Sequence, residues 1–424
     1  MLNKKQESYG YPSPLSTNED KASVAYGLQY FKTMYYEWHN NSDIYFRDRK
    51  LRYSRNRSYA EGNQDVGKYK DLLSSGGDTS YLNIDWSPVS IIPKFVDVIV
   101  NGMVNQEYDV KAESIDPVAA NKRLEKKKQM LGDMLSKDFL ENLEDETGIP
   151  LAPNGFVAQS SEEVDMFMAL NYKQNVEIAL EKAIEYTLNI NDYDQVKRYM
   201  IRDLVVLGLC AAKTDLSPTS GLSIRYVDPS NLITSFSASS DFKNMRHAGE
   251  VYSMTIADLK QQSGGEFSEE DYIKIANEYA GKNNNPMYFN TSSNYENGDN
   301  TYDYDKFSIN ILDAEFITSH ELKYEKKDNK KGGYSVNKKP SNYKQPKNSK
   351  TNRKAIGSTV KVVYTGKYIV GSDYVFNYGL MKDMPRTKSN LSETRLSYIV
   401  YQPNLYKMKS RSLVDRMVPF ADQI

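Results

Sequence analysis

The chain has 424 residues, enough for two or three domains, and its 55 Lys and Arg nearly balance its 56 Asp and Glu. A net charge near zero excludes a polybasic nucleic-acid wrapper, so any basic surface has to be local. The single cysteine, Cys210, excludes an intramolecular disulfide and a cysteine-based zinc site, and its apolar setting predicts a buried, inert thiol.

Neither a signal peptide nor a membrane span is expected. Residues 1–8 lack an apolar core, and the longest apolar run, 204–212, is too short to cross a bilayer. A cytosolic or virion setting remains.

Residues 1–17 are polar and predict a flexible N-terminal arm, with a helix capped by Thr17 or Asn18 after it. Apolar residues recur at steps of four and three along that helix, at Val24, Leu28, Phe31, Tyr35 and Trp38. The stripe fits a helix packed on its own domain, or one lying between subunits.

A basic, tyrosine-rich segment completes the N-terminal region 18–80. Its cations are Arg47, Arg49, Lys50, Arg52, Arg55 and Arg57, interleaved with Tyr45, Tyr53 and Tyr59. Such a segment can bind a phosphate backbone and stack on bases. The alternative is a solvated helix end whose cations pair with acids elsewhere in the chain.

Residues 81–280 predict an α/β core. Pro88 and Pro93 forbid one continuous helix, so a helix is expected to open at Pro93. We expect its apolar face to hold Phe95, Ile99 and Met103, with Val98 alongside. A short strand is predicted from the alternation of Tyr108, Val110 and Ala112, and a long charged helix from Asp116-Pro117 to about Glu146.

Two further helices predict a core hairpin. Ser160 and Glu163 have capping-box spacing, and the helix they start carries Val176, Leu180, Ala183, Ile184 and Leu188. The dipeptide at 191–192 is expected to cap the next helix, whose stripe is Val196, Met200 and Leu204. That helix becomes apolar all round after Leu204, which predicts a fully buried end.

Beyond residue 280 the pattern is mainly β. Residues 281–305 predict a surface insertion, and 306–411 a β-rich part with a strand over 314–324 and another over 396–401. The lysine-rich stretch 325–354 predicts a disordered basic loop, and residues 365–367 a hairpin turn. Ser412 and Asp415 have the spacing of a helix start at the head of 412–424, and Pro419 can begin a second helix.

Catalytic chemistry has no sequence signature. His39, His247 and His320 lack metal-ligand spacing, and no nucleophile elbow or phosphate-binding loop occurs. Asp299, Asp303 and Asp305 could hold a divalent cation but lack the pattern of an EF-hand, and predict a polar loop. We therefore expect no catalytic, cofactor-binding or metal-binding residues and no enzymatic activity.

The order of elements over 202–264 is distinctive: buried helix, hairpin, Asp228-Pro229 corner, second hairpin, short helix. With the stretches 83–102, 172–188, 204–233 and 364–379, it resembles portal proteins of tailed bacteriophages, most closely those of crAss-like phages. The resemblance implies an α+β wing of long helices packed on small antiparallel hairpins and sheets.

In that family the subunit forms a twelve-membered ring at one capsid vertex, with no hydrolytic site of its own. The ring contacts the major capsid protein, the terminase large subunit and the head-tail connector and tail proteins, and double-stranded DNA passes through its channel. Localisation would be the virion, and the host cytoplasm during assembly, without a membrane.

By the same resemblance, 412–424 would begin the stem helix, and the rest of a portal would follow this sequence. Two alternatives stay open. One is a metal-dependent phage nuclease or nucleotidyltransferase, and the other is a different head-tail adaptor of the virion.

Overall fold

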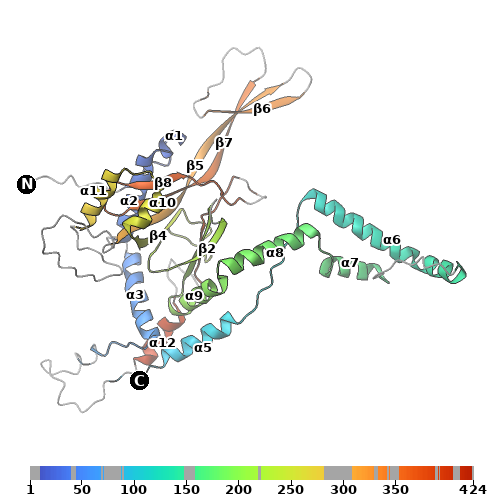
Figure 1. The fold of residues 1–424 in the computed structure, drawn as a ribbon, viewed down its shortest axis with the longest axis horizontal. Helices are drawn as coiled ribbons and strands as arrows, with labels where there is room; N and C mark the ends of the chain where they lie inside the picture. The colour runs from blue at the N-terminus through green and yellow to red at the C-terminus, as the bar shows by residue number, and fades with distance from the viewer. Residues whose placement is uncertain are drawn as a thin grey trace, which may run out of the picture. The chain divides into compact units, whose positions relative to one another are not determined.

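The computed structural model describes residues 10–39, 44–67, 70, 87, 90–147, 158–217, 221–280, 308–328, 333–340, 343, 353–386, 390, 392–403 and 411–422. Over these ranges the chain is α+β with antiparallel sheets, which confirms the predicted fold class (Figure 1). Most of the expected arm 1–17 and all of the expected insertion 281–305 lie outside the described residues.

The chain forms two compact units. The first combines Met1–Asn105 with Gln195–Ile424, and the second is Gln106–Asp194. The second unit is therefore an insertion in the first. The expected single core over 81–280 does not match this division, because nearly half of it, residues 106–194, forms the separate unit.

The first unit holds two antiparallel sheets within the described ranges. The larger has the order β3 (Leu232–Thr234), β4 (His247–Met254), β5 (Ile309–Asp328), β7 (Arg353–Ile369), β8 (Val375–Leu380), and β6 (Tyr334–Lys339) also pairs with β5. The smaller has the order β2 (Gly221–Val227), β1 (Cys210–Ser217), β9 (Tyr398–Tyr401). The strands predicted near 314–324 and 396–401 are confirmed.

Helix α2 (Val24–His39) packs on the larger sheet, after the short α1 (Asn18–Lys21), which Thr17 caps as predicted. Phe31 and Trp38 are buried in one cluster with Phe316 and Tyr364 of the sheet. The interpretation of this stripe as packing on its own domain is confirmed, although Val24 itself is exposed.

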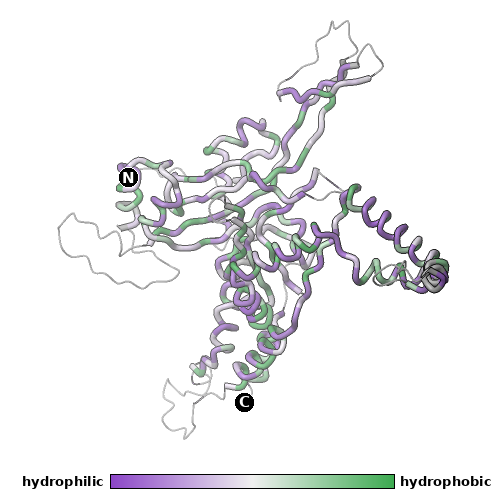
Figure 2. Tube along the Cα trace, turned by 45° about the vertical axis from the view of Figure 1, so that its right-hand side comes forward, coloured by the Kyte–Doolittle hydropathy of each residue, from purple (hydrophilic) through white to green (hydrophobic). Residues whose placement is uncertain are grey.

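Helices α3 (Ile44–Ala60), α5 (Ile92–Val104), α9 (Tyr193–Val206) and α12 (Leu413–Ala421) share a second cluster. Figure 2 shows the tube near the C-terminus largely in the hydrophobic colour, as this packing requires. The chain is buried continuously from 205 to 213, from the end of α9 into β1, as the apolar run predicts.

Two predictions for these helices are wrong. The buried face of α5 holds Ile92, Val96 and Val100, whereas Phe95 and Met103 are exposed; α5 is apolar almost all round, so spacing alone could not select the face. Pro419 lies inside α12 and starts no new helix, because it removes only the donor to one carbonyl near the helix end. Helix α12 buries Val414 and Val418.

A third cluster joins four strands of the larger sheet, β4, β5, β7 and β8, to two helices. Leu259 of α10 (Ile256–Ser263) and Ile275 of α11 (Glu269–Ala280) pack with Ile311, Ile369 and Phe376. Thr255 caps α10 through a capping box, and Gly264 closes it in the left-handed region, which explains the short helix predicted here.

The second unit contains α6 (Pro117–Thr147), α7 (Ser161–Leu170) and α8 (Asn175–Ile190). The long charged helix after Asp116 is confirmed. Ser160 caps only α7, and α8 is a separate helix with Gln174 at its start. The predicted core hairpin of α8 with α9 is wrong, because α8 belongs to the second unit and α9 almost entirely to the first.

The β-rich part differs from prediction in two places. Residues 334–339 of the expected disordered loop 325–354 form β6, paired with β5, while 329–332, 341–342 and 344–352 lie outside the described residues. Residues 365–367 form no turn: β7 continues through them with a register shift, and the turn to β8 follows Ile369. Gly366 is needed there because a Cβ would meet the Phe31 ring at 2.9 Å.

Candidate functional site

The basic segment of α3 is bound within the chain. Both terminal guanidinium nitrogens of Arg57 donate to the Asp228 carboxylate, at 3.2 and 2.6 Å. Arg55 donates to Asp415 at 2.9 Å, and buried Arg49 donates to the Leu232 carbonyl. For Arg55 and Arg57 the alternative of pairing with acids elsewhere is confirmed, and Arg49 is held by a backbone carbonyl.

Asn56 of α3 is fully buried and ties the ends of three helices together. Its side-chain amide donates to the Val206 carbonyl at the end of α9 and to the Ser412 hydroxyl at the start of α12, both at 3.1 Å. A buried amide with these partners supports one packing arrangement only. This part of α3 is therefore structural.

A small acidic cluster lies beside Arg57. The Tyr226 hydroxyl donates to the Asp203 carboxylate, and Arg57 lies 3.8 Å from Asp203. Burial raises the pKa of Asp203 to about 7, and it prevails over the opposing effects of Tyr226 and Arg57. Asp228 shows the reverse: burial raises its pKa, but the hydrogen bonds and charge of Arg57 prevail and lower it.

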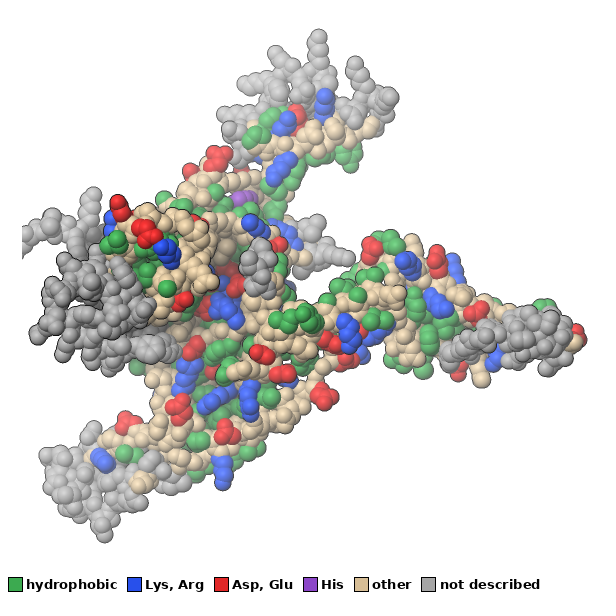
Figure 3. Space-filling view, in the orientation of Figure 1, with side chains coloured by type: hydrophobic (Ala, Val, Ile, Leu, Met, Phe, Trp, Pro, Cys, Tyr) green, Lys and Arg blue, Asp and Glu red, His purple; other side chains and the backbone are tan. Residues whose placement is uncertain are grey.

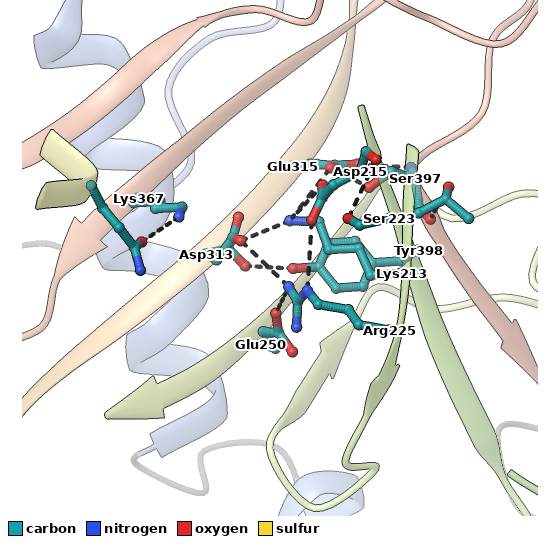
Figure 4. A network of polar contacts seen from close by, with 12 residues as sticks. Lys213, Asp215, Ser223, Arg225, Glu250, Asp313, Glu315, Lys367, Ser397 and Tyr398 are labelled. Atoms are coloured by element: carbon teal, nitrogen blue, oxygen red, sulfur yellow. Dashed lines mark hydrogen bonds and ion pairs between the residues drawn. The ribbon is translucent and has the colours of Figure 1, made fainter. Parts of the chain in front are cut away.

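A buried polar network of the first unit lies between the two sheets (Figure 4). At its centre the Lys213 ammonium lies 2.7 Å from the Asp313 carboxylate and 4.0 Å from that of Glu315. These three side chains, from β1 and β5, are almost wholly buried. The network thus connects the smaller sheet to the larger.

Further contacts complete this network. The Tyr398 hydroxyl donates to the Asp313 carbonyl at 2.9 Å, and the Ser397 backbone N–H donates to Glu315 at 2.9 Å. Arg225 of β2 pairs with Glu250 of β4 and lies 3.6 Å from Asp313. Figure 4 shows these side chains converging from both sheets.

The charges of the network assign it a structural role. Burial lowers the pKa of Lys213, but Asp313 and Glu315 outweigh burial and raise it, so the amine is protonated and cannot act as a nucleophile. Burial raises the pKa of Glu315 and Glu250 despite their cationic partners. A protonated lysine held by two carboxylates joins the sheets.

The three histidines lie apart, each with aromatic partners. His247 is hydrogen-bonded to the Tyr30 hydroxyl at 3.3 Å, and burial lowers its pKa to about 4. His320 bonds the Tyr364 hydroxyl at 2.9 Å, and His39 stacks on Tyr35.

In the part of the chain that the structure describes, we find neither a metal site nor a reactive thiol. No group of three or more His, Cys, Asp or Glu there could hold a metal ion. Asp299, Asp303 and Asp305 lie outside the described residues. Cys210 is buried as predicted, and burial raises its pKa to about 12.

Helix α8 has an inverted pattern of burial. Glu177 and Glu181 are buried, while Leu180 and Ile184 remain 47% and 42% exposed. Val176, one turn before Leu180, is exposed as well. Figure 3 shows apolar side chains at the surface along α8. We call the stripe of Val176, Leu180 and Ile184 the α8 apolar face.

The inversion has a local cause. Ala112 and Ser114 lie in a segment without regular secondary structure, and their backbone N–H groups donate to Glu181 and Glu177 at 3.1 and 3.0 Å. Lys173 also pairs with Glu181, at 2.7 Å. The predicted strand at 108–112 is therefore wrong: this segment satisfies its donors on glutamates one helical turn apart and joins no sheet.

Helix α5 also exposes apolar side chains. Phe95, Val98 and Met103 are exposed, while the opposite face is buried in the cluster with α3 and α12. Sequence reasoning identified these residues but assigned them to the core. Helix α5 carries more apolar residues than one buried face can hold, and this excess is the sequence signal for an exposed apolar side.

Comparison of the chain with protein-family models and with curated proteins gives no match. Within the ranges that the structure describes, no helix has the length and apolar character needed to span a membrane.

Proposed function

We propose that the chain is a structural subunit of a tailed-bacteriophage portal, a ring at one capsid vertex through which double-stranded DNA is packaged and ejected. The observation that carries the proposal is the α8 apolar face, supported by the exposed side of α5. Burying one leucine or isoleucine contributes about 1.5–3 kcal/mol, so such faces favour association.

Closure of a ring would bury these apolar faces between neighbouring subunits. In a heterologous interface one surface of a subunit contacts a different surface of the next, and a closed rotation produces a ring. Apolar faces in both units suit such an arrangement, because each copy needs two surfaces. The resemblance to portals in the order of elements over 202–264 suggests the twelvefold ring.

The remaining partners follow from the same resemblance. They are the major capsid protein, the terminase large subunit, the head-tail connector and tail proteins, and DNA in the channel. The location would be the virion, and the host cytoplasm during assembly. The buried network around Lys213 supports a structural role, because its lysine is protonated and paired.

The test is the mass and shape of the full chain. Multi-angle light scattering should give a mass many times the 48.5 kDa of the monomer, and negative-stain images should show rings. Leu180→Asp with Ile184→Asp should lower the mass without unfolding the protein, because aspartate cannot be buried cheaply at an apolar interface. The matched control is Asn175→Asp with Asn189→Asp, exposed positions on the other side of α8 that add the same two negative charges.

A monomer at all concentrations and salts would contradict the proposal. Equal loss of association in both double variants would show that the α8 apolar face is not the surface through which the subunits associate. Association into closed dimers only would favour another virion adaptor. Metal-dependent cleavage of DNA that survives repurification would favour the nuclease alternative.

A further inference from the structure

The far end of the larger sheet carries a local excess of positive charge. β4 pairs with β5 only up to Phe316, and β8 pairs with β7 only from Tyr364, so the outer parts of β5 and β7 run on as a ribbon, with β6 at one side (Figure 1). We call residues 323–328 and 334–339 the basic ribbon. Against Glu325 and Asp328 it holds five lysines: Lys323, Lys326, Lys327, Lys338 and Lys339.

The strand register places like charges opposite one another. Lys323 faces Lys339 across β5 and β6, and the β5–β7 register pairs position 326 with Lys354 and 327 with Arg353. Like charges directly opposite in a sheet destabilise it. The pair of Lys323 and Lys339 therefore does not stabilise the ribbon.

Little acid offsets these charges. Glu325 is buried, lies 3.1 Å from the Lys339 ammonium and accepts from the Tyr343 hydroxyl at 2.7 Å. Among the side chains that the structure describes, Glu325 and Lys339 form the one ion pair of the basic ribbon. The other ribbon lysines therefore keep their charge available to a partner.

Exposed aromatic and apolar surface lies among the lysines. Strand alternation places Lys326 and Lys338 on the same face as Tyr334 and Val336. Tyr334 is 65% exposed, and the Lys326 ammonium lies 4.2 Å from its ring centroid. An exposed ring beside cations is the arrangement with which proteins stack on bases while binding phosphates.

We infer that the basic ribbon binds nucleic acid, with Lys326 and Lys338 contacting the phosphate backbone on the face where Tyr334 offers a stacking surface, and Lys323 and Lys327 adding positive charge from the other face. Lys326 and Lys338 are diagonal neighbours on paired strands, about 7–8 Å apart, so their partner needs closely spaced negative charges. A nucleic-acid strand carries one charge per about 3.4 Å, whereas acidic protein surfaces mix both signs. This inference goes beyond the portal proposal and does not require a ring.

The test compares two quadruple variants of the full chain with equal charge. One changes the four lysines named above to Gln, and the control changes exposed Lys94, Lys122, Lys128 and Lys382 to Gln. Both take the net charge from −1 to −5. Fluorescence anisotropy with labelled duplex and single-stranded DNA is measured from 50 to 200 mM salt.

We expect the ribbon variant to bind at least about tenfold more weakly at 50 mM salt, with a salt dependence shallower by about 0.9 for each phosphate that it no longer binds. The control should bind like the original chain. Arg at the same four positions should restore binding, because it keeps the charge. The tighter of the two DNA forms identifies the preferred nucleic acid.

Equal binding by both quadruple variants would overturn the inference. So would polyglutamate competing as well as DNA at equal charge, because the ribbon would then fit an acidic protein. If the quadruple Gln variant misfolds, the decision passes to the single variants Lys326→Gln and Lys338→Gln and to Tyr334→Ala. Loss of single-stranded DNA binding in Tyr334→Ala would support the stacking surface, and unchanged binding in all three single variants would reject the ribbon as the site.

Discussion

At the scale of single residues, two helical glycines lie in opposite surroundings. A Cβ on Gly27 of α2 would collide with the Tyr378 ring, whereas one on Gly102 of α5 would meet nothing within 4 Å. We predict that Gly27→Ala lowers the free energy of unfolding by about 1–3 kcal/mol. Gly102→Ala should raise it by about 0.5–1 kcal/mol, because alanine has less backbone entropy to lose. Urea unfolding followed by circular dichroism measures both, and a change of the same sign in both would refute the close packing of α2.

Asp203 gives the stability a pH dependence of defined sign. Burial raises the pKa of its carboxyl from the usual 3.8 to about 7, so the folded state keeps a proton that the unfolded state has released. A raised pKa contributes stability below the unfolded value, and this contribution is lost as the pH rises through the folded value. We predict a loss on the order of 2 kcal/mol from this group between pH 5 and pH 8.

Asp203→Asn should remove that loss, because the amide does not titrate and its oxygen still accepts from Tyr226. Urea unfolding at pH 5 and pH 8 should show a smaller difference for the variant than for the original chain. Asp97→Asn, an exposed position on α5, is the control and should keep the full difference. An unchanged difference in Asp203→Asn would refute the assignment.

At the scale of elements, the network around Lys213 holds two sheets together. We predict that Lys213→Met costs about 3–5 kcal/mol of unfolding free energy, because Glu315 is left buried without a cation and Asp313 keeps only the more distant Arg225, at 3.6 Å. Adding Asp313→Asn and Glu315→Gln should recover much of that loss. Urea unfolding of the single and triple variants measures both effects. A triple variant no more stable than the single one would show that the charges themselves are not the cause.

Helix starts could be predicted from the sequence, and two of the strand assignments could not. Thr17, Ser160 and Ser412 accept the backbone N–H three residues ahead, an interaction encoded within four residues. β6 is rich in lysine and pairs with β5, and β7 runs through Gly366 because its partner strand continues. Pairing with distant strands overrode the local preference for loop and turn.

The candidate sites divide in the same way. The exposed residues of α5 and α8 were all recognised as apolar stripes, yet placed in the core. Nothing near Glu177 and Glu181 announces that the N–H groups of Ala112 and Ser114, more than sixty residues earlier, bury them. Which face of a helix is covered depends on partners that its own periodicity does not name.

At the scale of the whole molecule, the second unit is an insertion whose ends meet. Lys197 donates to the Val104 carbonyl at 3.1 Å and Arg198 to Asn101 at 2.6 Å, so the chain leaves and re-enters the first unit at adjacent points. We predict that replacing 106–194 by a short Gly/Ser linker leaves the first unit folded, with Tm changed by less than about 5 °C.

Differential scanning calorimetry of the shortened chain measures this, with deletion of 195–206 as the control. That control removes Val205 and Val206 from the cluster of α3, α5 and α12 and should abolish cooperative unfolding. A shortened chain that fails to unfold cooperatively would show that the two units depend on each other for stability.

The bond from Asn56 to Ser412 joins residues 356 positions apart. A ribosome adding roughly 5–20 residues per second takes on the order of 20–70 s to cover that distance. During that time α3, α5 and α9 have been made but α12 has not, so the apolar side chains that Val414 and Val418 cover in the folded protein remain exposed. Yield of the native protein should therefore depend on the pace of translation: slowing codons late in the message would lengthen this exposure, whereas the same codons before α3 would not.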